Sequence, residues 1–169
     1  GPASILRQNV GMLQSSPTDA TASPAARRQL AAVDLGSNSF RLLIVDVHDS
    51  SAGHQIRLLD QIKEGVRLGA GLDHHRDLSI EAQQRALAAL GRFSERLRGF
   101  DLDTVRAVAT NTFRVARNSA TFLREAGRTL GYPIEVIAGR EEARLIYVGA
   151  SHSLPLDHQP RLVVDIGGG

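Results

Sequence analysis

The amino-acid sequence predicts an α/β fold in which helices flank a mixed β-sheet. Three apolar, strand-sized runs come first, at residues 30–34, 40–47 and about 55–66. Helical and strand-like segments then alternate through the rest of the chain, an order that favours a mixed sheet with helices packed on it. The 169 residues are enough for one domain with a core, but hardly for two.

The first two runs are separated only by Gly36, Ser37 and Asn38. Gly and Asn accept the positive φ angles of tight hairpin turns, so the sequence predicts an antiparallel hairpin at this point. The third run ends in the glycine-rich segment 65–73 (GVRLGAGLD), which is expected to be a loop.

Three helices and three further strands are predicted in the second half. The first helix follows Ser79, a typical N-cap residue, runs for about 20 residues and ends at Gly99. Its apolar residues recur at spacings of three, four and seven and so share one face: Ile80, Leu87, Leu90, Phe93 and Leu97. Helices are also predicted from 118 or 119 to 131 and from 140 to about 151, and strands at 104–109, 134–138 and 162–165.

The N-terminal segment differs in composition from the rest of the chain. Residues 15–26 are almost entirely Ser, Thr, Pro and Ala, with a single charge at Asp19. Such a segment cannot bury enough apolar surface to offset the entropy lost on ordering. Residues 1–28 are therefore predicted to be a disordered arm, and residues 29–169 to form the folded lobe.

Composition limits the partners and the location. The net charge is +2 and the pI about 9.6, because the basic residues are nearly all arginine and Lys63 is the only lysine. The arginines are scattered and only 4% of residues are aromatic, so no nucleic-acid partner is expected. No apolar run reaches the length of a membrane span or an export signal, and we expect a cytoplasmic location without a membrane partner. The absence of cysteine excludes disulfide and thiolate chemistry.

Two segments 131 residues apart repeat one pattern, AAVDLG at 31–36 and LVVDIG at 162–167. Each has an aliphatic strand, an aspartate that could hold a metal ion (Asp34 and Asp165), and a glycine. Small residues with accessible backbone N–H groups follow, and these suit close approach to phosphate. The two predicted phosphate loops comprise Gly36, Ser37, Asn38 and Ser39, and Gly167, Gly168 and Gly169. The alternatives are an ordinary hairpin turn for the first and a flexible tail for the second.

Other residues are candidates for catalysis or phosphate binding. Glu141 and Glu142 lie in the first turn of a predicted helix, where the helix dipole keeps a carboxylate ionised, as a general base requires. Spacing alone does not choose between them. Arg114 follows a predicted strand and is placed to clamp a phosphate oxygen. Lys63 and Arg67 flank the glycine-rich loop and could do the same, although any of these cations could equally be a solvated surface charge.

Known nucleotide-binding and metal-binding motifs are missing. The chain lacks both GxxxxGK[ST] and GxGxxG, which argues against P-loop and Rossmann sites. No histidine has the spacing of a metal ligand.

The combination of motifs resembles the exopolyphosphatase / guanosine-pentaphosphate phosphatase family, within the actin-like superfamily of phosphotransferases. The segments AAVDLGSNSFRLLI, ATNTFR, IEVIAGREEARLIYVGA and LVVDIGGG stand in the order and spacing of that family, over about residues 29–169. The resemblance implies an actin-like (ribonuclease H-like) lobe, the N-terminal half of a two-lobed catalytic unit.

The resemblance also implies roles for residues. Glu142 matches the catalytic base and Arg114 an essential phosphate-binding arginine. Asp165 and the glycines after it match the second phosphate loop, whose aspartate holds a divalent cation, usually Mg²⁺; residues 36–39 match the first. The family's second loop continues beyond the point where this sequence ends, so we expect this chain alone to be inactive. Separately, we expect the complete protein to form a homodimer.

The implied reaction is hydrolysis of a terminal phosphoanhydride bond with release of orthophosphate. Inorganic polyphosphate is the favoured substrate, and guanosine pentaphosphate is the alternative that these motifs do not separate from it. A module that binds polyphosphate or an alarmone without turnover is a further alternative, although Glu142 and Arg114 are both present. A sugar-kinase-like phosphotransferase is less favoured, because its nucleotide-binding residues would have to lie outside this chain.

Overall fold

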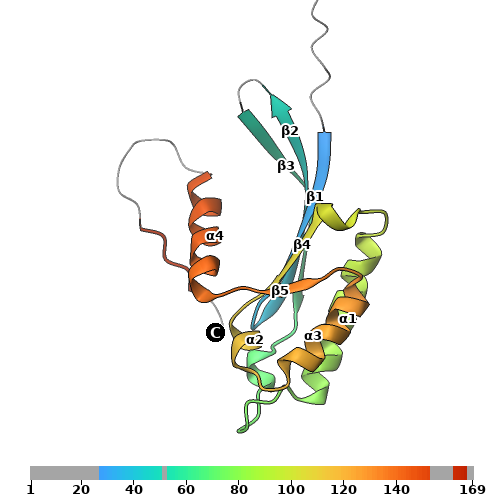
Figure 1. Ribbon diagram of the computed structural model, residues 1–169, viewed down its shortest axis with the longest axis vertical. Coiled ribbons are helices and arrows are strands. Elements are labelled where there is room, and N and C mark those ends of the chain that lie inside the picture. The colour runs from blue at the N-terminus through green and yellow to red at the C-terminus, as the bar shows by residue number, and fades with distance from the viewer. Residues whose placement is uncertain (1–26, 51–52, 153–161, 167–169) are drawn as a thin grey trace, which may run out of the picture.

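The computed structural model describes residues 27–50, 53–152 and 162–166. A five-stranded sheet in the order β3-β2-β1-β4-β5 forms its centre (Figure 1). Its strands are β1 (Arg27–Leu35), β2 (Ser39–Ser50), β3 (Gly53–Gly65), β4 (Val105–Ala109) and β5 (Ile134–Val136). The helices are α1 (Ile80–Arg96), α2 (Asn111–Val115), α3 (Ser119–Leu130) and α4 (Gly139–His152), with 3₁₀ turns η1 (Gly69–Gly71) and η2 (Leu102–Thr104).

The sheet is mixed, as the sequence predicts. Strands β1, β2 and β3 pair antiparallel, whereas β4 and β5 join parallel on the other side of β1. Burial alternates along β1: Ala31, Val33 and Leu35 point into the core, while Ala32 and Asp34 point to the opposite face. This alternation places Asp34 on the face turned away from the core. The chain has the α/β lobe with a mixed sheet flanked by helices that the sequence predicts.

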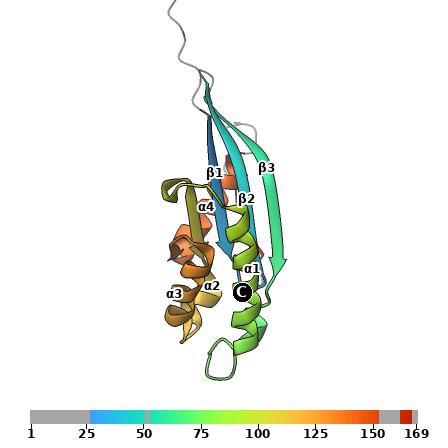
Figure 2. The same ribbon diagram turned by 90° about the vertical axis from the view of Figure 1, so that its right-hand side faces the viewer.

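Helices α1 and α3 lie side by side on one face of the sheet (Figures 1 and 2). The Ser79 side chain accepts a hydrogen bond from the Ala82 amide at 3.2 Å, which confirms the predicted N-cap of α1. Phe93 from α1 and Phe122 from α3 are fully buried against the sheet. Helix α4 stands on the opposite side, and none of its residues 139–151 is buried.

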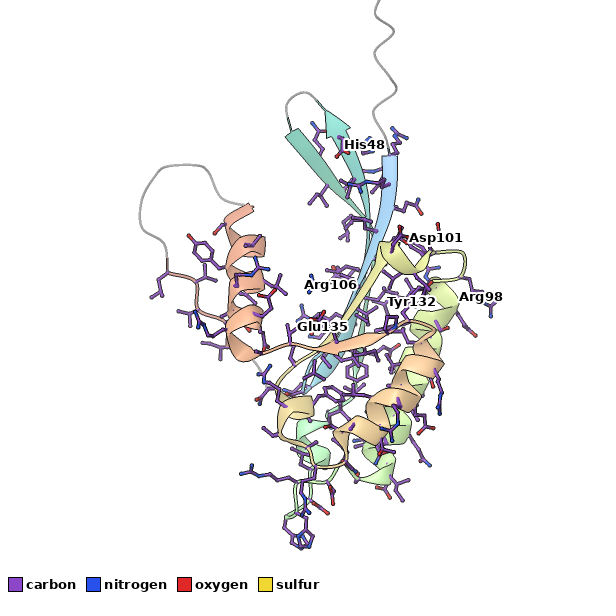
Figure 3. The ribbon with its side chains drawn as sticks, in the orientation of Figure 1. His48, Arg98, Asp101, Arg106, Tyr132 and Glu135 are labelled. Atoms are coloured by element: carbon purple, nitrogen blue, oxygen red, sulfur yellow. The ribbon has the colours of Figure 1, made fainter. Side chains whose placement is uncertain are left out.

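Beyond the helices, the β2–β3 hairpin is stabilised by a polar cluster. The buried Asp46 carboxylate lies 2.9 Å from His48 Nε2 and accepts a hydrogen bond from Arg57 Nη2 at 3.2 Å. Figure 3 shows His48 on this distal part of the hairpin. Hydrogen bonds from these two side chains lower the Asp46 pKa against the effect of burial, which would raise it.

Several sequence predictions are wrong in detail. Ile80 is 69% exposed, because α1 presents a face rich in alanine to the sheet, at Ala82, Ala86 and Ala89. Residues 162–166 form no strand; a strand needs a pairing partner, and the sheet of the described residues does not include this segment. The short helix α2 was not predicted, because five residues are too few for a hydrophobic period.

Two further predictions concern the ends of β1. Residues 27–28, assigned to the disordered arm, belong to β1 and pair with Val47 and His48; the rest of that arm, 1–26, lies outside the described residues. The hairpin is confirmed, but neither Gly36 nor Asn38 has a positive φ. Gly36 is needed for another reason, because a Cβ there would lie 2.9 Å from the Ser39 carbonyl oxygen.

Among the described residues, no helix combines the length and the apolar character that crossing a bilayer requires.

Two glycines give a matched test of this backbone. Gly131 ends α3 with φ +85°, a left-handed conformation that L-residues rarely adopt, whereas Gly91 lies inside α1 with open space around it. Gly131→Ala should therefore destabilise the chain by about 1 kcal/mol, and Gly91→Ala should stabilise it by up to about 1 kcal/mol. Urea denaturation of both variants measures the difference, and equal effects of the same sign would contradict this assignment.

Candidate active site

A cavity of about 900 Å³ opens between the sheet and α4. Its walls come from five places in the chain: the β1–β2 loop, the face of the sheet opposite α1 and α3, α2, α4 and residues 165–166. The polar and charged residues that line it are Asp34, Ser37, Asn38, Ser39, Arg41, Lys63, Thr110, Asn111, Arg114, Glu142 and Asp165. The structure thus brings together segments up to 131 residues apart, including both aspartates of the repeated pattern.

The β1–β2 loop, residues 36–39, is held by the glycine-rich segment that follows β3. The amides of Val66 and Arg67 both donate to the Asn38 carbonyl at 2.9 Å, and the Gly69 amide donates to the Ser37 carbonyl at 3.0 Å. The Ser37 and Asn38 carbonyls are therefore occupied. Within the described part of the chain, the backbone N–H groups of Ser37 and Asn38 have no backbone partner, and both residues line the cavity, an arrangement that suits an anion.

The same loop is fastened to α2 by side chains. Thr112 Oγ1 donates to Ser37 Oγ at 2.8 Å, and both residues are buried. Just before the helix, the Thr110 amide donates to the Leu35 carbonyl at 3.3 Å. A single short helix therefore fixes the loop on one side and carries Arg114 on the other.

Arg114 links α2 to the start of α4. Its Nη1 donates to the Ile137 carbonyl at 2.8 Å and to Glu142 Oε2 at 2.9 Å, and both side chains are little more than a quarter exposed. A Cβ on Gly139 would lie 4.0 Å from Arg114 Nη2, so the guanidinium lies directly against the first turn of α4. A charge-assisted pair of this geometry orients both groups toward the cavity.

The two candidate glutamates have different surroundings. Glu142 lines the cavity and contacts Arg114. Glu141 does not line it, and instead accepts two hydrogen bonds from Arg144 at 2.8 Å. These bonds lower the Glu141 pKa and hold its carboxylate on the outer face of α4. The cavity therefore contains Glu142, the glutamate that the motif resemblance singles out.

Asp34 lies among charges of both signs. Its pKa is raised, first because the surrounding protein displaces water from the carboxylate, and further by the negative charges of Glu142 and Asp165, while Arg41 opposes the shift. Crowded carboxylates of this kind suit a divalent cation. No group of three or more His, Asp or Glu side chains among the described residues could hold a metal by itself.

The remaining predicted site residues divide into three groups. Lys63 lines the cavity beside the β1–β2 loop, whereas Arg67 is not among the lining residues, although its backbone N–H holds that loop. The three glycines at 167–169 lie outside the described residues. Among the lining or supporting residues that were missed are Arg41 and Thr112. For Arg41 the alternation along β2 was an available signal, because it pairs with Asp34 on the same face.

The contact between the loop and α2 predicts an energetic coupling. Thr112→Val and Ser37→Ala each remove one partner of a buried hydrogen bond. The double variant should lose less stability than the sum of the two single losses, by about 1 kcal/mol. Urea denaturation of the four proteins of this cycle gives the value. Strict additivity would mean that the two hydroxyl groups do not interact.

The raised pKa of Asp34 predicts a stability change. A folded-state pKa above the ordinary value means that ionised Asp34 destabilises the fold, so its effect is absent at low pH and grows as pH rises through that pKa. Asp34→Asn should therefore raise the Tm at pH 7, by about 2 °C or less because cavity water screens the charge. This gain should vanish near pH 3. Glu95→Gln, the same change of charge on the exposed surface of α1, is the control, and an equal gain there would contradict the local explanation.

Comparison with known proteins gives the family of this fold and cavity. The sequence profile of the Ppx/GppA phosphatase family matches residues 44–169. An exopolyphosphatase from Cytophaga hutchinsonii is similar at 30% identity and a TM-score of 0.74, over 84% of this chain and 44% of its own. An exopolyphosphatase-like protein is 33% identical with a TM-score of 0.68, over 80% of this chain and 40% of its own.

A Ppx/GppA enzyme from Aquifex aeolicus is 26% identical, with a TM-score of 0.68 over 76% of this chain and 42% of its own. The chain thus spans less than half the length of these solved relatives. Because the family profile covers most of the sequence and its motifs line one cavity, the chain belongs to the Ppx/GppA phosphatase family.

Proposed function

We propose that the protein containing this chain hydrolyses the terminal phosphoanhydride bond of inorganic polyphosphate and releases orthophosphate. The observation that carries the proposal is the pairing of Arg114 with Glu142 at the edge of the cavity that the β1–β2 loop lines. One group is suited to hold a phosphate and the other to deprotonate water. An exopolyphosphatase and an exopolyphosphatase-like protein are among the similar solved structures, which supports this choice of substrate.

Binding of the terminal phosphate uses this chain's own donors. The N–H groups of Ser37 and Asn38 and the guanidinium of Arg114 offer hydrogen bonds to its oxygens. Donors fixed before the substrate arrives stabilise the charge that spreads over the transferring group, where most catalysis of phosphoryl transfer resides. The rigid support from Thr112 and the glycine-rich segment provides this fixed arrangement.

Glu142 then acts as the general base. Arg114 and the N-terminal turn of α4 place positive charge beside its carboxylate. The base takes a proton from a water molecule as the water oxygen bonds to phosphorus, and the bond from phosphorus to the bridging oxygen breaks. The shortened chain leaves with the electron pair of that bond. A phosphate oxygen at Arg114 competes with Glu142 for the guanidinium, which leaves Glu142 Oε2 free to accept a hydrogen bond from the attacking water.

Asp34 and Asp165 are the residues proposed to hold Mg²⁺. Both line the cavity, and the pKa of Asp34 is raised first by burial of its carboxylate and further by the negative charges of Glu142 and Asp165. Mg²⁺ takes one or two carboxylates and fills its remaining positions with water and substrate phosphates, so two aspartates fit it. The ion would supply positive charge to the phosphate oxygens.

Guanosine pentaphosphate remains the second candidate substrate, because it presents a terminal phosphate to the same residues. A comparison of kcat/KM for both substrates on one preparation decides between them. A binding protein without turnover would show calorimetric binding of polyphosphate and no release of orthophosphate.

Two adjacent glutamates provide a test of the mechanism. In a protein that carries this chain together with the further length of its relatives, Glu142→Gln should lower kcat for orthophosphate release by about 10²–10⁴-fold. Glu141→Gln, one residue away and paired with Arg144 outside the cavity, should change it by less than about threefold. The measurement is phosphate release from polyphosphate with Mg²⁺ present. Near-normal turnover of Glu142→Gln would refute the assignment of the base.

A further inference from the structure

The segment between β3 and α1, residues 66–78, contacts two separate supports of the cavity wall (Figure 1). At the start of this β3–α1 segment, the amides of Val66, Arg67 and Gly69 hold the carbonyls of the β1–β2 loop. At its end, it contacts the residues that join α2 to α3. Because the β1–β2 loop and Arg114 of α2 both line the cavity, a single segment touches the supports of both.

The contact at the end of the segment is made by Asn118. Its Oδ1 accepts a hydrogen bond from the Leu78 amide at 2.9 Å, and its Nδ2 donates to the Leu78 carbonyl at 3.0 Å. Next to it, the Arg117 amide donates to the Arg76 carbonyl at 3.0 Å. One side chain thus binds both backbone groups of Leu78, the two-way pairing that opposed residues of antiparallel strands make.

Asn118 occupies a position where its side chain would ordinarily do something else. It is the N-cap residue of α3, and an N-cap Asn usually accepts a hydrogen bond from an amide of the first helical turn. In the described part of the chain it makes no such bond, and its side-chain amide binds Leu78 instead. The side chain therefore sets the position of the α2–α3 junction and does not cap the helix.

The β3–α1 segment is itself fixed between its two ends. The Ser79 amide donates to the Gly71 carbonyl at 2.9 Å, and Leu72 and Leu78 form an isolated bridge. A Cβ on Gly71 would lie 2.5 Å from the Cβ of Ala82, so this part of the segment packs directly against α1. A segment anchored in this way holds the structures at its two ends at a fixed separation.

Helix α2 depends on support of this kind. It has only five residues, and a helix of that length is not stable through its own hydrogen bonds. Thr112 is fixed to Ser37, and Phe113 is buried in the core. Arg114 follows both of these anchors, and Asn118 comes four residues after it. The contact of Asn118 with Leu78 thus fixes the chain on the far side of Arg114.

We propose that Asn118 is a positioning residue for the reaction. By binding Leu78 it fixes the end of α2, and so holds the Arg114 guanidinium at a set distance from the N–H groups of the β1–β2 loop. The proposal rests on the proposed function, because it takes Arg114 and that loop to bind the same phosphate. Asn118 is not among the residues that line the cavity, so it acts through Arg114. A misplacement of about 1 Å can cost about 10²-fold in rate, so a small movement of Arg114 is enough.

The kinetic test uses a protein that carries this chain together with the further length of its relatives. Asn118→Ala should lower kcat for orthophosphate release from polyphosphate by about 10–100-fold, with a much smaller change in KM. In an Arg114→Ala background the same substitution should lower kcat by less than about threefold, because the group that it positions is gone. Equal losses in the two backgrounds would overturn the proposal.

Asp46→Ala is the matched control for lost stability. Asp and Asn side chains have the same shape, and Asp46 also contacts two partners, but it lies on the distal hairpin and does not line the cavity. Both alanine variants should lower the Tm, by roughly 4–8 °C, whereas Asp46→Ala should change kcat at 25 °C by less than about threefold. An equal loss of kcat in Asp46→Ala would mean that stability explains the effect, and would also overturn the proposal.

A spectroscopic readout on this chain does not require turnover. In NMR spectra, the side-chain Nε–H resonance of Arg114 should shift in Asn118→Ala and keep its parent position in Asp46→Ala. Asn118→Ser, whose shorter side chain keeps at most one bond to Leu78, should give a smaller shift, and it replaces the alanine variant if that variant does not fold.

The two proposals fail in different ways. An unchanged Arg114 resonance in the Asn118 variants would remove the positioning role and leave the role of Glu142 standing. Full turnover by Glu142→Gln would remove the hydrolytic function and leave the NMR result intact.

Discussion

The arrangement of the cavity depends on one guanidinium group. Arg114 donates a hydrogen bond to the Ile137 carbonyl, in the short segment between β5 and α4, and another to Glu142 of α4. No residue of α4 from 139 to 151 is buried, so apolar packing contributes little to the position of that helix. Hydrogen bonds from a charged donor, worth about 1.5–3 kcal/mol, therefore have a large share in holding the wall opposite the sheet. The same group has to serve the fold and, as proposed, the substrate.

The fold itself rests on a different set of interactions. The sheet and the pair α1 and α3 share one core, in which Phe93 and Phe122 are fully buried. Around it the carbonyls of Leu97 and Phe100 lie 3.0 and 2.9 Å from the Tyr132 hydroxyl, which ties the end of α1 to the start of β5. The cavity occupies the other face of the sheet, where Arg106 and Glu135 form an ion pair at 3.3 Å (Figure 3). Stability and site are thus separated onto the two faces of the sheet.

Local patterns predicted most of the fold. The apolar run at 30–34 and the cap at Ser79 each depend on neighbouring residues, and the structure confirms the strand and the cap. The segment 162–166 has the same aliphatic pattern as β1 but takes no strand conformation, because pairing depends on a partner that a local pattern cannot supply. Ile80 was misplaced because the spacing of large residues was counted and the alanines that meet the sheet were not.

The site was predictable to the extent that it follows from motifs. Asp34, Glu142 and Arg114 share a cavity as those motifs indicated, although they are far apart in sequence. The bond between Thr112 and Ser37 could not be predicted, since it depends on a short helix that has no signature of its own. The cross-strand pairing of Arg41 with Lys63 could not be predicted either. It depends on the register between β2 and β3, which shifts at an irregularity between Ile44 and Val45.

Strand β3 forms one edge of the sheet, and this position affects how the chain can associate with other chains. Near its C-terminal end, Arg92 and Arg96 of α1 reach over to pair with Glu64 and Asp60 and partly cover that edge. Farther along, Ile56, Leu58 and Leu59 are exposed at 56%, 54% and 39% with no such cover among the described residues. An uncovered apolar edge is a template for added strands, so self-association of the isolated chain would start from the distal half of this hairpin.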